Sequence, residues 1–570
     1  MKKRCLNNTV KALISVTSLA VAISQAWSQS SQSAAASNQA ALPSRLLDSA
    51  GLPVQSGSGA YWGEPLANSN SAPLAGAKVV APSKLQEAVQ MAITTSPDVL
   101  FAYRNLESVV RDKQAAAGRY LPGIDFNSSV GRENRNDPIP SANNVYKRFS
   151  RETNSIVLRQ LIFDGGNTLN DVARLDFNVR GKIFELHAAA SSSALETTRA
   201  YVDLIRYRTL VSLAEDNYVA HKLIFEQLKL KATAGVGKKS DVEQAQSRFA
   251  LAEYNLNVEG SNLHDIEARF QRHTGMLPPA DLDPSLPVAK DVPLTSQDAL
   301  KSSQMTNPGL LASVMDIKGQ EAAARVRVSS ALPRVEFRAR HDWGTNINGY
   351  LGAHRNDVVE VVTTWNLLNG GTDFNLHRKE LELIQSAQKR RDLTCRNIRL
   401  ELQIAYNDIR KLKEQMNYLD ARQISIERAR DAYRQQFEIG QRSLVDLLNS
   451  ENEVFEAKRL YTNISSDLTI AYARAHFQLG SLLKVLNVQR YAYDEMPLPE
   501  VDGAHVNDLA VSCEAESPTP YRANKQELDA RAGEMLNPAK LQAPQTQNLN
   551  QDFKTMVDES RGAPKTGQSK

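Results

Sequence analysis

Apolar residues recur at alternating spacings of three and four between residues 398 and 437, and this is the clearest pattern in the chain. The positions are Ile398, Leu402, Ala405, Ile409, Leu412, Met416, Leu419, Ile426, Tyr433 and Phe437. A seven-residue repeat of this kind, interrupted at Gln423 and Arg430, is typical of helices that pack side by side in a supercoil. The helical pattern begins near residue 372 and predicts a helix of about 65 residues, on the order of 100 Å long.

A weaker version of this pattern predicts a second long helix over residues 167–234. Each long helix is followed by a shorter helical pattern, at 240–274 and at 443–482. Two more helical stretches, 84–119 and 295–330, come earlier in each half of the chain. We therefore expect one hairpin per half, in which two short helices stacked end to end lie beside one long helix.

Alternation of apolar and polar residues predicts four strands between these helices. Two begin near residues 124 and 335, and two return at 155–163 and 358–368. In the last of them one face carries Val359, Val361, Thr363, Trp365 and Leu367. Strands of about 10 residues with one apolar face suit a membrane barrel with interfacial aromatic residues, although two soluble hairpins have the same pattern. The candidate interfacial aromatics are Trp343, Tyr350 and Trp365.

The number of strands limits how they can sit in a membrane. Four strands cannot close a barrel, and open sheet edges are not tolerated in lipid. If these strands lie in a membrane, several chains must therefore share one barrel.

The two halves of the chain repeat one another at an offset of about 205 residues. The matching pairs are Ser96-Pro97 with Asn307-Pro308, Leu121-Pro122 with Leu332-Pro333, Asp164-Gly165-Gly166 with Asn369-Gly370-Gly371, and Gly237-Lys238-Lys239-Ser240 with Gly440-Gln441-Arg442-Ser443. Anchors in one order at nearly one offset indicate a duplicated unit. We expect a first repeat at 84–294 and a second at 295–490.

The flanks have a different composition. Residues 1–28 have the basic start, short apolar run and small residues of a secretory signal peptide. Its four basic residues account for the formal net charge of +4, so the expected mature chain has 64 basic and 64 acidic residues and nucleic acid is not indicated. Residues 29–83 form a low-complexity linker and 491–570 a polar tail; neither has the apolar spacing of a buried core, so both are expected to be disordered.

Cysteine and histidine patterns indicate no catalytic chemistry. Cys5 precedes the apolar run of the leader, which leaves Cys395 and Cys513. Whether these two pair stays open; their settings favour unpaired thiols. The nine histidines are scattered, so we expect no metal site and no cofactor. Residues 235–240 resemble a phosphate-binding loop, but Ala232 stands where its first glycine is required and Lys239 where Ser or Thr is required.

Together, these features resemble the TolC family of bacterial outer-membrane export channels over residues 84–490. The resemblance is carried by the Ser-Pro and Asn-Pro helix starts, the Leu-Pro strand entries, residues 160–166 and 365–371, and the two Gly-x-x-Ser turns. It implies a mainly α chain whose duplicated helical hairpins form an α-helical barrel. Four strands per chain would complete a twelve-stranded membrane β-barrel in a homotrimer. Phe163-Asp164-Gly165-Gly166 looks more like the type I secretion members than the multidrug efflux members.

The second helical turn is similar to the aperture segment of the family, where a Tyr, an Arg and two Asp residues latch the closed entrance. By that match Arg442 is the latch arginine and Asp446 forms the first acidic ring. Phe437 replaces the tyrosine and Asn449 the second aspartate, so cation binding at the mouth is expected to be weaker.

On the first turn, Asp241 matches the partner of the latch arginine. A simpler reading is open at both turns. Ser240-Asp241-Val242-Glu243 has the form of a capping box, and Ser443 to Asp446 fits its looser version, so these residues can serve mainly to start helices.

The resemblance implies a passive conduit and no enzyme. In this interpretation the chain resides in the outer membrane, contacts its lipid, and extends into the periplasm. A periplasmic adaptor protein and an inner-membrane ABC transporter would deliver an unfolded protein, for example a large repetitive adhesin or toxin. Two alternatives remain: the outer-membrane factor of a multidrug or metal efflux pump, and a soluble periplasmic coiled-coil scaffold.

Overall fold

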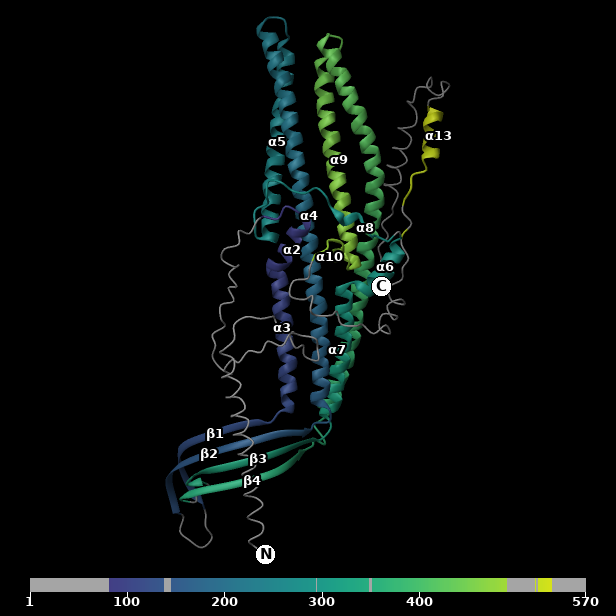
Figure 1. The fold of residues 1–570 in the computed structure, drawn as a ribbon. Coiled ribbons are helices and arrows are strands. Elements are labelled where there is room, and N and C mark those ends of the chain that lie inside the picture. The colour runs from purple at the N-terminus through teal and green to yellow at the C-terminus, as the bar shows by residue number, and fades with distance from the viewer. Residues whose placement is uncertain are drawn as a thin grey trace, which may run out of the picture. The chain divides into compact units, whose positions relative to one another are not determined.

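The computed structural model describes residues 81–137, 145–293, 295–347, 351–488, 518 and 521–535, all within one compact unit. The duplication is visible in the lengths of the helices. The long helices α4 (Asn167–Thr233) and α8 (Thr372–Glu438) each contain 67 residues, and α5 (Lys239–Thr274) and α9 (Leu444–Leu479) each contain 36. The predicted pair of long-helix hairpins is therefore confirmed (Figure 1).

Short helices complete each half as predicted, but each predicted stretch is broken in two. The elements are α2 (Leu85–Thr95), α3 (Pro97–Ala117) and the 3-10 turn η2 (Gly118–Tyr120) in the first half, and α6 (Ser296–Thr306) and α7 (Pro308–Ser330) in the second. The 3-10 turn η3 (Pro287–Ala289) lies at the end of the first half, before α6. Ser96 and Asn307 are extended because the residue before a proline avoids the helical region. Asn307 also caps α7, accepting from the Leu310 amide at 3.1 Å.

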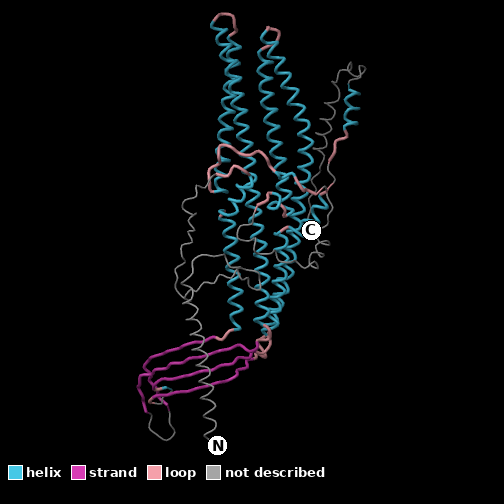
Figure 2. Tube along the Cα trace, in the orientation of Figure 1, coloured by secondary structure: helices cyan, strands magenta, loops and turns pink. Residues whose placement is uncertain are grey.

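Each long helix is lined by its shorter partners. Helices α3, α2 and α5 pack along α4, and α7, α6 and α9 pack along α8 (Figure 1). The halves join where α4 contacts α7 and α9. Figure 2 shows the strands at one end of the helices and the two hairpin turns at the other.

The heptad positions of α8 differ in burial along its length. Residues 398, 402, 405, 409 and 412 are buried against the other helices, whereas 416, 419, 426, 433 and 437 are only half-buried. The part of the seam nearest the hairpin turn is thus incompletely covered within one chain. Among the described residues, no helix is both long and apolar enough to cross a membrane.

The four strands form one antiparallel sheet in the order β1 (Gly123–Asp137), β2 (Val145–Phe163), β3 (Arg334–Thr345) and β4 (Ala353–Thr364). The register places Ile124 beside Leu158, Leu158 beside Ala339, and Ala339 beside Val359. One face of the sheet is thereby apolar and largely exposed, with Ile124, Phe126, Val130, Ile156, Val359 and Val361 on it.

The last strand begins and ends earlier than the predicted 358–368. It ends at Thr364, so Trp365 and Leu367 lie beyond the sheet. The Trp365 indole N–H instead donates to the Ala331 carbonyl at 3.2 Å, next to the end of α7. Trp343 does lie in β3, with its ring 6.2 Å from that of Phe126. Tyr350 lies outside the described residues.

The repeated Gly-Gly pairs turn each returning strand into a long helix. Gly165 and Gly166 have φ of 69° and 82°, and Gly370 and Gly371 have 67° and 81°. The Asp164 carboxylate accepts from the Gly166 amide at 3.1 Å and the Thr168 amide at 2.8 Å, which satisfies free donors at the start of α4. A side chain at Gly165 would also meet Leu332 and the Ser329 carbonyl.

Cys395 departs from the sequence expectation. It is fully buried on α8 and is disulfide-bonded, not a free thiol. After α10 (Leu482–Val485), the described part of the predicted tail contains Pro518 and a helix, α13 (Lys525–Met535). No residue of α13 is buried, in keeping with its weak apolar pattern. The predicted signal peptide and the predicted linker up to residue 80 lie outside the described residues.

Candidate functional site

The candidate site is at the two hairpin turns, and both have the same backbone geometry. Gly235 after α4 and Gly440 after α8 each have a φ of 76°. The amides of Val236 and Gln441 each bond back to a carbonyl five residues earlier, at 3.0 and 2.8 Å. These are Schellman turns, in which a glycine in the left-handed region satisfies the last helical carbonyls. Both turns therefore reverse the chain tightly before the following helix.

The two turns differ in how the next helix begins. Ser443 is the N-cap of α9, and its hydroxyl accepts from the Asp446 amide at 3.2 Å, as predicted. The predicted capping box at Ser240 is wrong. Helix α5 begins at Lys239, so Ser240 is already inside the helix and its hydroxyl contacts Asp241 at 3.3 Å. Capping therefore accounts for Ser443 but not for Ser240.

Arg442 interacts with groups on its own hairpin. Its guanidinium lies 3.6 Å from the Asp446 carboxylate, and its centre is 4.2 Å from the centroid of the Tyr433 ring. The side chains of Arg442 and Asp446 are 37% and 41% exposed. In the described part of one chain, Arg442 and Asp241 form no ion pair. The aromatic partner Tyr433 lies one helical turn before Phe437, at a seam position that sequence reasoning assigned only to packing.

Phe437 occupies the space between the two hairpins. From α8 it packs on a cluster contributed by the other three helices near the turns, α4, α5 and α9, which comprises Ile224, Leu228, Ala245, Leu444, Leu447 and Leu448. The Lys231 ammonium lies 5.7 Å from its ring centroid. The ring that replaces the family tyrosine is therefore a packing group that ties the first hairpin to the second.

Asn449 bonds across the hairpins as well. Its Oδ1 accepts a hydrogen bond of 2.9 Å from the Arg248 guanidinium on α5. Sequence reasoning missed Arg248 because an arginine on a polar helix face has no distinguishing pattern. Only the register between α5 and α9 brings the two residues together.

A buried charged residue lies two positions after Asn449 on α9. Glu451 on α9 is 5% exposed and pairs with Arg434 and, at 3.7 Å, with Arg430 of α8. His221 of α4 is buried near this carboxylate, and burial lowers its pKa below the usual value. The Glu451 ion pairs thus join α8 to α9 within the second hairpin, directly behind its turn.

The comparisons with known proteins agree with this architecture. Residues 299–481 match the family described as "Outer membrane efflux protein". The outer membrane efflux protein BepC of Brucella suis is 22% identical over 320 residues, covering 56% of this chain and 70% of that protein. The outer membrane protein TolC of Vibrio cholerae is 21% identical over 300 residues, covering 50% and 67%. The chain belongs to the TolC family of outer-membrane channels.

Solved TolC-family channels have the same fold as this chain. The CmeC outer membrane channel of Campylobacter jejuni superposes with a TM-score of 0.61 at 14% identity, covering 75% of this chain and 90% of that one. The outer membrane protein VceC of Vibrio cholerae superposes with a TM-score of 0.59 at 15% identity, covering 70% and 96%. At these identities the likeness establishes the fold alone.

Membership of the TolC family decides between several of the functions considered above. The protein is a channel of the outer membrane that extends into the periplasm, and it is not an enzyme. The soluble scaffold is thereby excluded. The matched range contains Phe437, Arg442, Asp446 and Asn449 of the second turn, whereas Ser240 and Asp241 of the first turn lie before it.

Proposed function

We propose that three copies of the chain form one conduit, a twelve-stranded barrel in the outer membrane that continues as a helical tunnel through the periplasm. Channels of this family are homotrimers that work with adaptor proteins and inner-membrane pumps. The observation that carries the proposal is the sheet. In the described sheet, β1 and β4 each pair on one side only. Lipid does not satisfy free backbone donors and acceptors, so the β1 edge of one copy must pair with the β4 edge of the next.

The two faces of the sheet support this assembly. The exposed apolar face suits contact with the lipid chains. The opposite face carries ion pairs such as Arg159 with Asp125 at 2.6 Å, and Arg338 with Glu336 and Arg340 with Asp342, each at 2.8 Å. Ion pairs of this kind are suited to a water-filled lumen. Mass measurement of the detergent-solubilised protein tests the assembly: a trimer is expected, and a stable monomer would overturn it.

At the other end, the proposal places the two hairpin turns at the periplasmic mouth. A threefold axis would bring each Arg442 and Asp446 close to their copies. Arg442, already held by Tyr433 and Asp446, would have Asp241 of a neighbouring copy within reach. The carboxylates of Asp446 would then form an acidic ring that favours cations. Because Asn449 is neutral and engaged by Arg248, it adds no second ring.

For the cargo, we propose export of an unfolded protein in type I secretion, received from an inner-membrane ABC transporter through a periplasmic adaptor. Support comes from Phe163-Asp164-Gly165-Gly166, whose aspartate and glycines form the turn into α4. A strain lacking the gene is expected to lose one or more large proteins from the culture medium. An unchanged set of extracellular proteins would overturn this assignment while leaving the channel intact.

Efflux of small molecules or metal ions is the second candidate. It is favoured by the family description and by the name of BepC, both of which specify efflux. The same deletion strain separates the two candidates. Sensitivity to drugs or metal ions with normal protein secretion supports efflux, and the reverse pattern supports secretion.

A further inference from the structure

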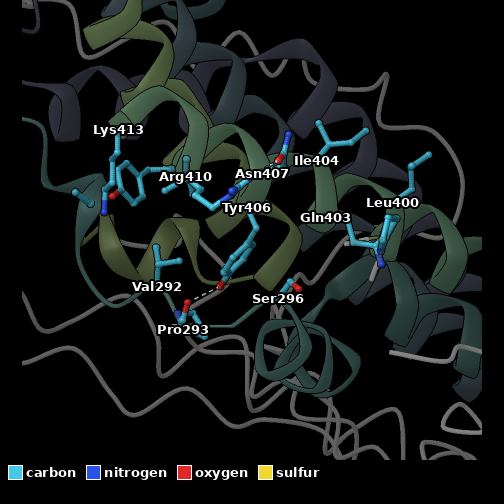
Figure 3. A pocket seen from close by; sticks show the side chains of 14 residues that line it. Val292, Pro293, Ser296, Leu400, Gln403, Ile404, Tyr406, Asn407, Arg410 and Lys413 are labelled. Carbon is cyan, nitrogen blue, oxygen red and sulfur yellow. Dashed lines mark hydrogen bonds between the residues drawn. The ribbon is translucent and has the colours of Figure 1, made fainter. Parts of the chain in front are cut away.

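A cavity lies beside the middle of α8, away from both the hairpin turn and the sheet. Its volume is about 750 Å³, which is in the range of protein sites that hold ligands. One wall is the stretch of α8 from Leu400 to Lys413, and the facing wall is the chain before α6, around Val292 and Pro293 (Figure 3). The cavity is thus a groove along one helix, closed on one side by the segment that joins the two repeats.

Hydrogen bonds hold the wall before α6 in place. The Tyr406 hydroxyl of α8 donates to the Pro293 carbonyl at 2.9 Å. Burial raises the pKa of Tyr406 to about 12, so the hydroxyl keeps its proton and remains a donor. From α9, the His476 ring bonds the Lys290 carbonyl at 2.8 Å. Because the segment is tied to both helices, the groove is formed before anything binds in it.

The chemistry of the groove changes along its length. Leu400 and Ile404 lie at one end and are 53% and 38% exposed. Arg410 and Lys413 lie at the other end, with Asn407 between the two pairs (Figure 3). From Leu400 to Lys413 the helix rises about 20 Å at 1.5 Å per residue. The groove therefore offers an uncovered apolar end and a cationic end about 20 Å apart.

The cationic end has no acidic partner in the described part of the chain. The Arg410 guanidinium donates to the Asn407 side-chain oxygen at 3.0 Å, and the Lys413 ammonium lies 5.4 Å from the centroid of the Tyr472 ring. Neither makes an ion pair with a described residue. No acidic side chain, not even Glu414 next to Lys413, is among the described residues that line the cavity. Two positive charges therefore face the groove uncompensated.

Acidic residues elsewhere on the surrounding elements are already engaged. Glu401 and Asp408, on the same stretch of α8, pair with Arg474 of α9 at 3.3 and 3.4 Å. Asp298, near the start of α6, accepts from the Thr295 hydroxyl at 2.7 Å. Within the described residues these contacts leave the charges of the groove open to an external anion.

We propose that the groove binds an extended peptide of a partner protein, with apolar side chains against Leu400 and Ile404 and acidic side chains on Arg410 and Lys413. An extended chain spans about 20 Å in about six residues, which matches the length of the groove. Charge complementarity then fixes the register of the peptide, and burial of the apolar end adds affinity. The site lies apart from the mouth and the sheet, so the proposal goes beyond the conduit and does not depend on its cargo.

Fluorescence anisotropy tests the site with the full-length protein in lipid nanodiscs. The probes are fluorescein-labelled hexapeptides of sequence LFVGDE and its neutral counterpart LFVGNQ. The acidic peptide is expected to bind about tenfold more tightly, because the neutral one loses two partly exposed ion pairs. Equal affinities for the two peptides, or binding of neither, would overturn the proposal, whatever the assembly state or cargo of the channel.

Charge reversal separates recognition from a purely structural role of the two cations. The double variant Arg410→Glu, Lys413→Glu is expected to prefer the basic peptide LFVGKR over LFVGDE. Lys411→Glu is the matched control, because Lys411 is exposed between them on α8 but does not line the groove; it should keep the wild-type preference. A double variant that loses all peptides alike, or keeps the wild-type preference, would contradict the assigned contacts.

Two other occupants are distinguished by the same assay. Pro518, in the tail of this chain, also lines the cavity, so the tail is one competitor. If LFVGDE binds only after removal of residues 491–570, the groove belongs to the tail. If it binds the monomer in detergent but not the assembled protein, a second copy covers the groove. Either result would replace the external peptide as the occupant.

Discussion

Arg442 gives the sharpest test of the proposed mouth. Within one chain it makes an ion pair of 3.6 Å with Asp446 and a cation–π contact of 4.2 Å with Tyr433, both at a partly exposed site. An exposed ion pair contributes about 0.2–1 kcal/mol, and an exposed cation–π contact about 0.5–1 kcal/mol. Removal of Arg442 therefore destabilises the state that has both contacts by about 1–2 kcal/mol per chain.

The threefold arrangement multiplies this cost. If opening the mouth breaks these contacts in all three copies together, removing Arg442 lowers the stability of the closed state by about 3–6 kcal/mol, which is on the order of 10² to 10⁴ in the ratio of closed to open channels. This is an upper value, since a contact that is kept in the open state contributes nothing to the free-energy difference between the closed and open channels. Arg442→Ser should therefore increase single-channel conductance in a planar bilayer.

Three further variants locate the effect. Asp241→Ala should increase conductance only if a neighbouring copy supplies the contact, because Asp241 does not pair with Arg442 within the described part of one chain. Combining it with Arg442→Ser should then give less than the sum of the two effects. Asp446→Ala should reduce cation preference. Lys239→Ser is the matched control, because it removes a positive charge from the first turn without touching the latch.

The result that would refute this reasoning is specific. If Arg442→Ser, Asp241→Ala and Asp446→Ala form normal trimers with wild-type conductance and selectivity, these side chains have no role in the mouth. The cap provided by Ser443 would then be the main role of the second turn.

Three other predictions follow from the described contacts. Burial lowers the pKa of His476 from its ordinary 6.5, and its neutral ring bonds the Lys290 carbonyl and the Ser481 hydroxyl, each at 2.8 Å. The stability that this histidine gives the fold is complete above about pH 6.5 and is lost as the pH falls toward the lowered pKa. Thermal unfolding should show a smaller acid-induced loss in His476→Gln than in the wild type or in the exposed control His264→Gln. Gly165→Ala should destabilise the folded protein by more than about 1 kcal/mol, because φ is positive there and the new Cβ would lie 2.6 Å from Leu332. In the control Gly370→Ala the new Cβ meets no atom within 4 Å, so this variant should lose less stability, and equal melting temperatures of the two variants would contradict the prediction. Val359→Arg, on the apolar face, should weaken the barrel by about 2–4 kcal/mol and abolish heat-modifiable migration, while Val358→Arg on the opposite face should be tolerated.

The sequence by itself determined the elements whose signal is local and repeated. Burial of one helix face requires apolar residues every three or four positions, so the long helix ending at Glu438 could be predicted almost to the residue. The alternating residues of the strands and the paired glycines after them carry the same kind of local signal. The duplication then related α4 to α8, although the seam of α4 is weaker.

Only the tertiary structure decided which side chains meet. Arg248 and Asn449 are about 200 residues apart, and their contact depends on how far α5 slides along α9, a register that no local pattern encodes. The same holds for Tyr433 as the partner of Arg442, and for the bonded state of Cys395, whose helical surroundings favoured a free thiol. Even the two similar Gly-x-x-Ser turns start their helices differently, with a serine cap at Ser443 and none at Ser240. An N-cap side chain stabilises a helix by only about 1 kcal/mol, so the packing of neighbouring helices outweighs it and sets where each helix begins.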